Sequence, residues 1–91
     1  DVMENLKNNT FFFNNKNKII INNEFFNKPY EIVFRSFSNC LKIVGKRYYN
    51  VRGKKLDNII LKIRNNSDFK ATLGGCIIKK VNQTIIVSKE H

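Results

Sequence analysis

Residues 30–44 carry apolar side chains at the spacing of an amphipathic α-helix. At about 100° per residue these side chains fall within an arc of about 100°, which forms one face for burial. The members of this face are Tyr30, Val33, Phe34, Phe37, Leu41 and Val44. The segment Asn27–Pro29 predicts the helix start, because Asn accepts a hydrogen bond from an open N–H group and Pro suits the first turn. Gly45 is predicted to end the helix as a left-handed cap.

Ile32 and Ile43 lie on nearly the opposite side of the same helix. This second apolar patch predicts contact with a further element or with another domain.

The C-terminal half predicts a second helix and a β-hairpin. Residues 46–53 are predicted to form a loop, and residues 54–64 carry an apolar helical stripe made of Leu56, Ile59, Ile60 and Ile63. Asn65-Asn66-Ser67 is predicted to end this helix. Three β-like runs follow, with a bend at Gly74-Gly75 and a turn near Asn82-Gln83, over residues 69–73, 76–81 and 84–89. The last two runs predict an antiparallel hairpin.

Residues 1–27 carry a weaker pattern. Residues 1–10 are polar and predict the end of a helix or a tail, and Phe11–Phe13 form an apolar cluster. Residues 18–22 predict a short strand, because consecutive Ile residues suit a pleated surface. We therefore expect an α+β fold, with two amphipathic helices packed beside a short antiparallel β-hairpin unit. Residues 1–27 would be a connecting segment with a short strand, and residues 28–91 a helix–loop–helix plus a C-terminal hairpin.

The charge of the chain favours a polyanionic partner. Its 91 residues suffice for one small domain, and 17 Lys and Arg against 7 Asp and Glu give a net charge of +10. Lys, Asn, Ile and Phe have A/T-rich codons, so base composition explains part of this charge. The remainder favours a polyanionic partner such as nucleic acid, but charge alone does not choose between RNA, DNA and an acidic membrane. No apolar run approaches the ~20 residues of a membrane span. Without a secretory signal or a disulfide framework, we expect a cytoplasmic protein that does not contact a membrane.

The sequence gives little support for catalysis or metal binding. The only histidine is the terminal His91, so no nucleophile has a candidate base, and the acidic residues are scattered. Cys40 and Cys76 lack the paired spacing of a metal site and are expected to be small buried hydrophobes. Gly74-Gly75 joins two β-like runs, which favours a bend over a phosphate loop. We expect no catalytic residue, no metal and no cofactor in this chain.

Positive charge gathers in the helix–loop–helix segment. Its basic residues are Lys42, Lys46, Arg47, Arg52, Lys54, Lys55 and Lys62, interleaved with Tyr48 and Tyr49. Lys and Arg can neutralise phosphates, and a Tyr ring can stack on an unpaired base. The pattern alone leaves two interpretations open: an RNA-binding face, or the solvated side of an amphipathic helix with the tyrosines in the core. The candidate RNA-binding residues are Arg52, Lys54, Lys55, Lys62, Lys46, Arg47 and Tyr49.

The order of several short segments is distinctive. Residues 31–35 read EIVFR, residues 44–49 read VGKRYY, residues 69–78 read FKATLGGCII and residues 85–90 read IIVSKE. This order resembles the region that follows the catalytic domain in bacterial tRNA(Ile)-lysidine synthetase. The resemblance covers about residues 28–90, and residues 72–76 are its most specific part. Family members often have Pro one or two residues before the Arg that matches Arg52, where this chain has Asn50-Val51.

The resemblance implies a role in tRNA modification. The family uses ATP to adenylate the wobble cytidine of a minor isoleucine tRNA, and lysine then displaces AMP. That chemistry belongs to an N-terminal domain with a Ser-Gly-Gly-x-Asp-Ser loop, which is not found here, so ATP and lysine are implied only for the parent enzyme. This chain would be a noncatalytic tRNA-binding module beside that catalytic domain. The match marks Arg52 for RNA contact, whereas Leu73, Gly74 and Gly75 would shape the hairpin.

Two alternatives remain open. The chain could be a structural domain that packs on its parent enzyme through Ile32, Ile43 and Phe11–Phe13. It could also be a free-standing basic protein that binds DNA through the helix–loop–helix, although the loop is long for a compact helix-turn-helix.

Overall fold

The computed structural model describes residues 1–13, 17–46, 53–65 and 68–90, with the side chain of Phe13 left out. The chain forms three α-helices, one short 3₁₀ helix and a five-stranded antiparallel sheet, which confirms the predicted α+β class. The helices are α1 (Val2–Asn9), α2 (Tyr30–Gly45) and α3 (Gly53–Arg64), and η1 (Asn23–Asn27) is the 3₁₀ helix. The strands are β1 (Thr10–Phe13), β2 (Lys18–Ile21), β3 (Phe69–Leu73), β4 (Cys76–Val81) and β5 (Thr84–Lys89).

The sheet joins the two ends of the chain. Its strand order is β1-β2-β5-β4-β3, so the N-terminal hairpin adds to the C-terminal hairpin through β2 and β5. Ile19 lies opposite Val87 and Ile21 lies opposite Ile85, which pairs inward-facing residues of both ends. Residues 1–27 therefore share one sheet with the C-terminal strands. The sequence pattern did not predict this pairing, because it depends on contacts between distant segments.

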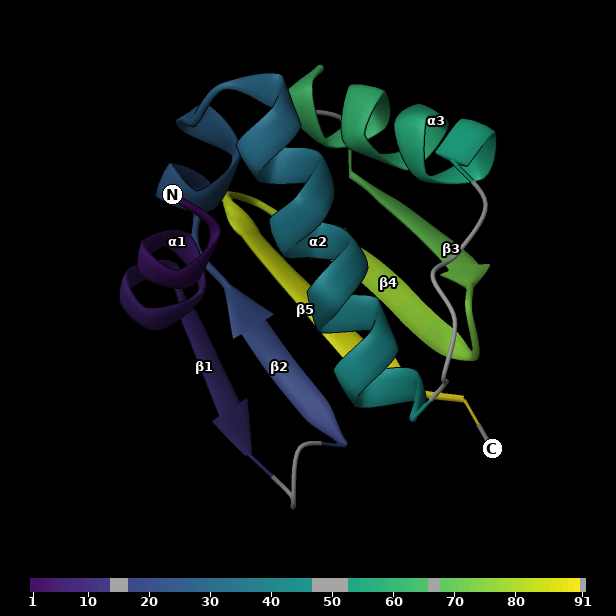
Figure 1. Cartoon of the computed structure of the whole chain (residues 1–91). Helices are drawn as coiled ribbons and strands as arrows, with labels where there is room; N and C mark the ends of the chain where they lie inside the picture. Colours follow the sequence, from purple (N-terminus) through teal and green to yellow (C-terminus); the bar gives the residue numbers. More distant parts are fainter. Residues whose placement is uncertain (14–16, 47–52, 66–67, 91) are drawn as a thin grey trace.

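All three α-helices lie on the same side of the sheet. Figure 1 shows α2 crossing the sheet diagonally, with α1 beside it toward β1 and α3 beside it toward β3. The predicted faces of α2 and α3 are confirmed in the core, where Phe37, Leu41 and Leu56 are fully buried. The residues of β4 and β5 that face the helices complete the core on the sheet side, as the alternating burial along these strands shows. Tyr30 departs from the prediction, because 39% of its surface stays exposed.

The C-terminal hairpins follow the predicted turns. Gly74 and Gly75 both adopt positive φ angles, of 62° and 78°. This is the left-handed pair that a tight two-residue hairpin turn requires, and Gly reaches it without strain. Asn82 also has a positive φ, of 57°, in the turn between β4 and β5.

The two predicted caps of α2 are both wrong. The N-cap is Pro29, which makes no side-chain cap hydrogen bond, while Asn27 belongs to η1. At the other end Lys46 takes the left-handed conformation and its backbone N–H donates to the carbonyl of Lys42. Gly45 is still helical, and a Cβ built there would lie within 3.0 Å of the Gly74 carbonyl oxygen. Close approach of α2 to the β3–β4 turn therefore explains this glycine.

Asn5 ties α1 to the rest of the core. It is 2% exposed, its Nδ2 donates to the Phe25 carbonyl at 3.2 Å and its Oδ1 accepts from Asn9 Nδ2 at 2.8 Å. Asn5→Ala is expected to lower the free energy of unfolding by about 1–3 kcal/mol, because the buried Phe25 carbonyl loses this donor. Urea denaturation measures the change. The exposed Asn8→Ala is the control, and equal losses in both variants would contradict a special role for Asn5.

Candidate nucleic-acid interface

The outer side of α3 carries three of the predicted RNA-binding lysines. The buried stripe of α3, which includes Ile60 at 0% exposure, faces the core. Lys54, Lys55 and Lys62 are exposed on the remaining surface of this helix. Within the described part of the chain, these three lysines make no ion pair. The structure therefore brings the three side chains to solvent on one helix, where they can reach an external anion.

The first turn of α3 is strongly positive. Lys54 and Lys55 lie in this turn, which contains no acidic residue. The N-terminal end of a helix already carries a partial positive charge from its open N–H groups, so cations there do not help the helix. The same combination of N–H groups and cations attracts phosphate.

The other predicted site residues divide into two groups. Lys46 is exposed at the C-terminal end of α2, where its backbone forms the left-handed cap. Arg47, Tyr49 and Arg52 lie outside the described residues, and their predicted role in RNA contact stays a prediction.

Arg64 is a basic residue of α3 with a structural role. Its Nη2 donates to the Lys28 carbonyl at 3.1 Å, and its guanidinium lies 5.5 Å from the ring centroid of Tyr30. Arg64 thus fastens the end of α3 to the start of α2. Helical spacing did not single out this residue, because its partners come from a distant segment.

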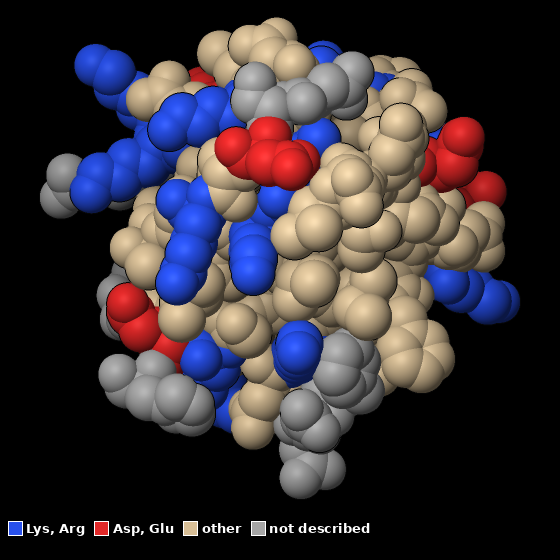
Figure 2. Space-filling view, turned by 180° about the vertical axis from the view of Figure 1, so that it is seen from behind, with Lys and Arg blue, Asp and Glu red and all other residues tan. Residues whose placement is uncertain are grey.

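The sheet has a second face that no described helix covers, which we call the open sheet face. Its residues point away from the helices at alternate positions of the strands. They are Phe11, Lys18, Ile20, Lys70, Thr72, Ile77, Lys79, Val81, Thr84, Ile86 and Ser88. Figure 2 looks at the molecule from this side and shows Lys and Arg gathered on the left and centre, with some acidic side chains among them, and a broad uncharged area right of centre.

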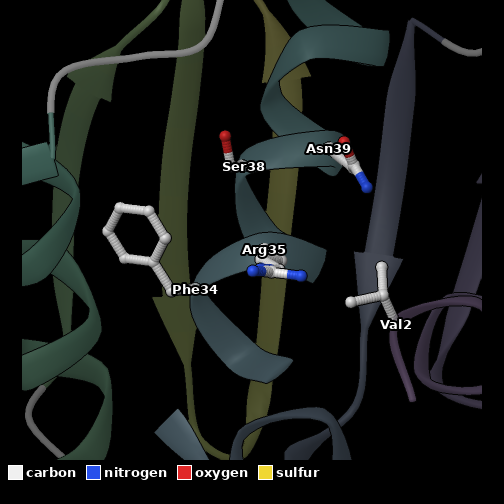
Figure 3. A pocket seen from close by; sticks show the side chains of 5 residues that line it. All are labelled: Val2, Phe34, Arg35, Ser38 and Asn39. Carbon is white, nitrogen blue, oxygen red and sulfur yellow. The ribbon is translucent and has the colours of Figure 1, made fainter. Parts of the chain in front are cut away.

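A shallow hollow lies on the outer surface of α2. It has a volume of about 420 Å³ and is lined by Val2, Phe34, Arg35, Ser38 and Asn39 (Figure 3). Arg35 is the cation of this hollow, and it pairs with Glu31 at 2.9 Å. Among the described residues that line it, no nucleophile lies beside a base.

The two cysteines are buried, as the sequence predicted. Burial raises the pKa of the Cys40 thiol far above its ordinary value, and the neighbouring Cys76 raises it further. Cys76 Sγ lies 3.4 Å from the Leu41 carbonyl, to which its thiol donates. A buried neutral thiol is a poor nucleophile and a poor metal ligand. Among residues 1–13, 17–46, 53–65 and 68–90, no three His, Cys, Asp or Glu side chains cluster to hold a metal ion.

No described helix combines the length and the apolar character needed to cross a bilayer.

Comparison with known proteins shows a similarity to a tRNA-modifying enzyme. The chain is similar to a tRNA(Ile)-lysidine synthase from Wolbachia sp. subsp. Brugia malayi (strain TRS), with 29% identity over 68 residues. The match covers 74% of this chain and 16% of the length of that enzyme. This similarity is consistent with a chain related to a small region of a tRNA-modifying enzyme. No protein-family model matches the chain, and no solved structure matches it.

Proposed function

We propose that this chain is a noncatalytic, tRNA-contacting accessory region of a tRNA(Ile)-lysidine synthetase. The observation that carries the proposal is the 29% identity over 68 residues to such an enzyme, in a chain whose net charge is +10. The exposed lysines of α3 supply the phosphate contacts, and they orient tRNA without reading its bases. In this proposal ATP and lysine bind to a catalytic domain in the cytoplasm, and this chain is the partner of that domain.

The alternative of a purely structural domain receives less support from the geometry. Its predicted contact residues do not share one surface. Ile43 is 36% exposed and lies on α2, on the helical side of the sheet, whereas Phe11 is 66% exposed and points from the open sheet face. A single partner domain would need to contact both sides of the molecule to cover these residues.

The double variant Lys54→Gln/Lys55→Gln tests the α3 contact. We expect affinity for tRNA to fall about five- to tenfold at low salt, and the slope of log affinity against log salt to decrease by about 1.5. Thermal stability is expected to hold or rise slightly, because two cations leave the positive end of α3. Fluorescence anisotropy with labelled tRNA over a salt series measures the binding.

A control variant separates a local contact from net charge. Lys7→Gln/Lys28→Gln removes the same charge from exposed sites on other elements and is expected to change the salt slope by less. Equal slopes for both double variants would contradict the α3 contact. No measurable binding of tRNA by the unchanged protein would contradict the proposed function as a whole.

A further inference from the structure

The strand register places an apolar row beside a cationic pair on the open sheet face. Phe11 lies opposite Ile20, and Ile20 lies opposite Ile86. Continuing across the sheet, Ile86 lies opposite Lys79, and Lys79 lies opposite Lys70. One row of directly paired residues therefore crosses all five strands, and at about 4.8 Å per strand it measures about 19 Å along the sheet.

The apolar half of this row is accessible. Phe11 is 66% exposed and Ile20 is 37% exposed, which is high for a phenylalanine and an isoleucine that lie side by side. Isolated apolar residues on a surface are ordinary, but a contiguous row of them marks a contact site. The aromatic ring at its end can stack on any planar base.

The lysine pair at the other end of the row destabilises the fold when no anion is bound. Lys70 and Lys79 are both exposed and directly opposite each other on β3 and β4. Like charges in direct cross-strand register destabilise a sheet. Among the described residues neither lysine forms an ion pair, although the alternation of β3 places Asp68, two residues before Lys70, on the same side of the sheet. This arrangement favours a bound anion that contacts both lysines.

We infer that the open sheet face binds an unpaired stretch of RNA, with phosphates on Lys70 and Lys79 and a base against Phe11 and Ile20. The inference rests on the proposed function, since it assigns a second contact for the same RNA. A paired duplex presents phosphates but keeps its bases stacked inside, so it would leave the apolar half of the row without a contact. An unpaired strand presents both groups within the length of the row.

Two variants test the inference with a single-stranded probe. The probe is a labelled oligouridylate of about ten nucleotides, the length expected of one small binding face. Phe11→Ala is expected to weaken its binding about tenfold, because base stacking is lost, and to leave binding of a fully paired RNA hairpin nearly unchanged. Lys70→Gln/Lys79→Gln is expected to weaken binding of oligouridylate and to lower its salt slope by about 1.4.

The controls separate this inference from the proposed function. Lys7→Gln/Lys28→Gln removes equal charge elsewhere and is expected to have the smaller effect on oligouridylate. If oligouridylate binds equally well to the Phe11→Ala variant, or if both double variants lose the same affinity, the inference is wrong. The contact between α3 and tRNA is tested separately, by the variant Lys54→Gln/Lys55→Gln. Unchanged RNA binding together with loss of self-association in Phe11→Ala would assign the face to protein contact and overturn the inference.

Discussion

Replacement of Phe37 by alanine is expected to lower the free energy of unfolding by about 3–5 kcal/mol. Phe37 is fully buried on α2, and its ring lies 5.5 Å from Phe26 and 6.4 Å from Phe25 between ring centroids. The substitution leaves a cavity where three rings from α2 and η1 meet. Domains of this size have only modest total stability, so the variant is expected to be largely unfolded at room temperature. Circular dichroism during urea denaturation measures the loss.

Phe11→Ala is the matched control for this cavity. It removes the same side chain from an exposed position on β1, where 66% of the surface contacts solvent. The expected change in stability is below about 1 kcal/mol. A loss in Phe11→Ala as large as in Phe37→Ala would contradict the position of the core between helices and sheet.

Gly45→Ala is expected to destabilise the protein by about 1–3 kcal/mol. Alanine in place of glycine inside a helix normally stabilises it, by about 0.5–1 kcal/mol. Here the new Cβ would collide with the Gly74 carbonyl oxygen and lie 3.3 Å from Cys76 Sγ. Backbone cannot move aside as a flexible side chain can, so α2 and the β3–β4 turn must separate. Thermal denaturation measures the change in stability.

Gly53→Ala, at the start of α3, is not expected to destabilise the protein. A Cβ there would lie 3.7 Å from Phe34 Cζ, which is an ordinary contact. The free energy of unfolding is expected to stay the same or to increase, because alanine lowers the conformational entropy of the unfolded chain. A stabilising Gly45→Ala would show that α2 does not approach the β3–β4 turn as closely as described.

The local parts of the fold could be predicted from the sequence. The segment 54–64 has four apolar residues at helical spacing, and α3 covers Gly53–Arg64. The pair Gly74-Gly75 between β-like runs fits only a tight turn, and β3 ends at Leu73 while β4 begins at Cys76. In both cases neighbouring residues determine the structure, so a pattern within a short window is sufficient.

The non-local parts could not be predicted in the same way. Three consecutive Ile residues indicated a strand, but they could not show that β2 pairs with β5. The prediction for Gly45 was wrong for a related reason. The residue matched a cap signal along the chain, whereas its role comes from the turn between β3 and β4.

The candidate interface also has one part that local sequence pattern predicts and one part that it does not. Exposure of Lys54, Lys55 and Lys62 follows from helical spacing alone, and the structure places all three at the surface of α3. The open sheet face needs the strand register, because Phe11 and Ile20 become neighbours only through β1–β2 pairing, and Lys70 and Lys79 only through β3–β4 pairing. Composition showed that the chain is basic, but it could not show where apolar and cationic groups meet.

Competition between tRNA and duplex DNA tests the proposed function most directly. Labelled tRNA bound to the protein would be displaced by unlabelled tRNA or by DNA with the same number of phosphates, at physiological salt. We predict that tRNA displaces the label at a concentration at least about tenfold lower than duplex DNA does, since nonspecific charge contacts alone would treat both alike. Equal displacement by both competitors, or stronger displacement by DNA, would contradict a tRNA-contacting role and favour a general basic nucleic-acid-binding protein.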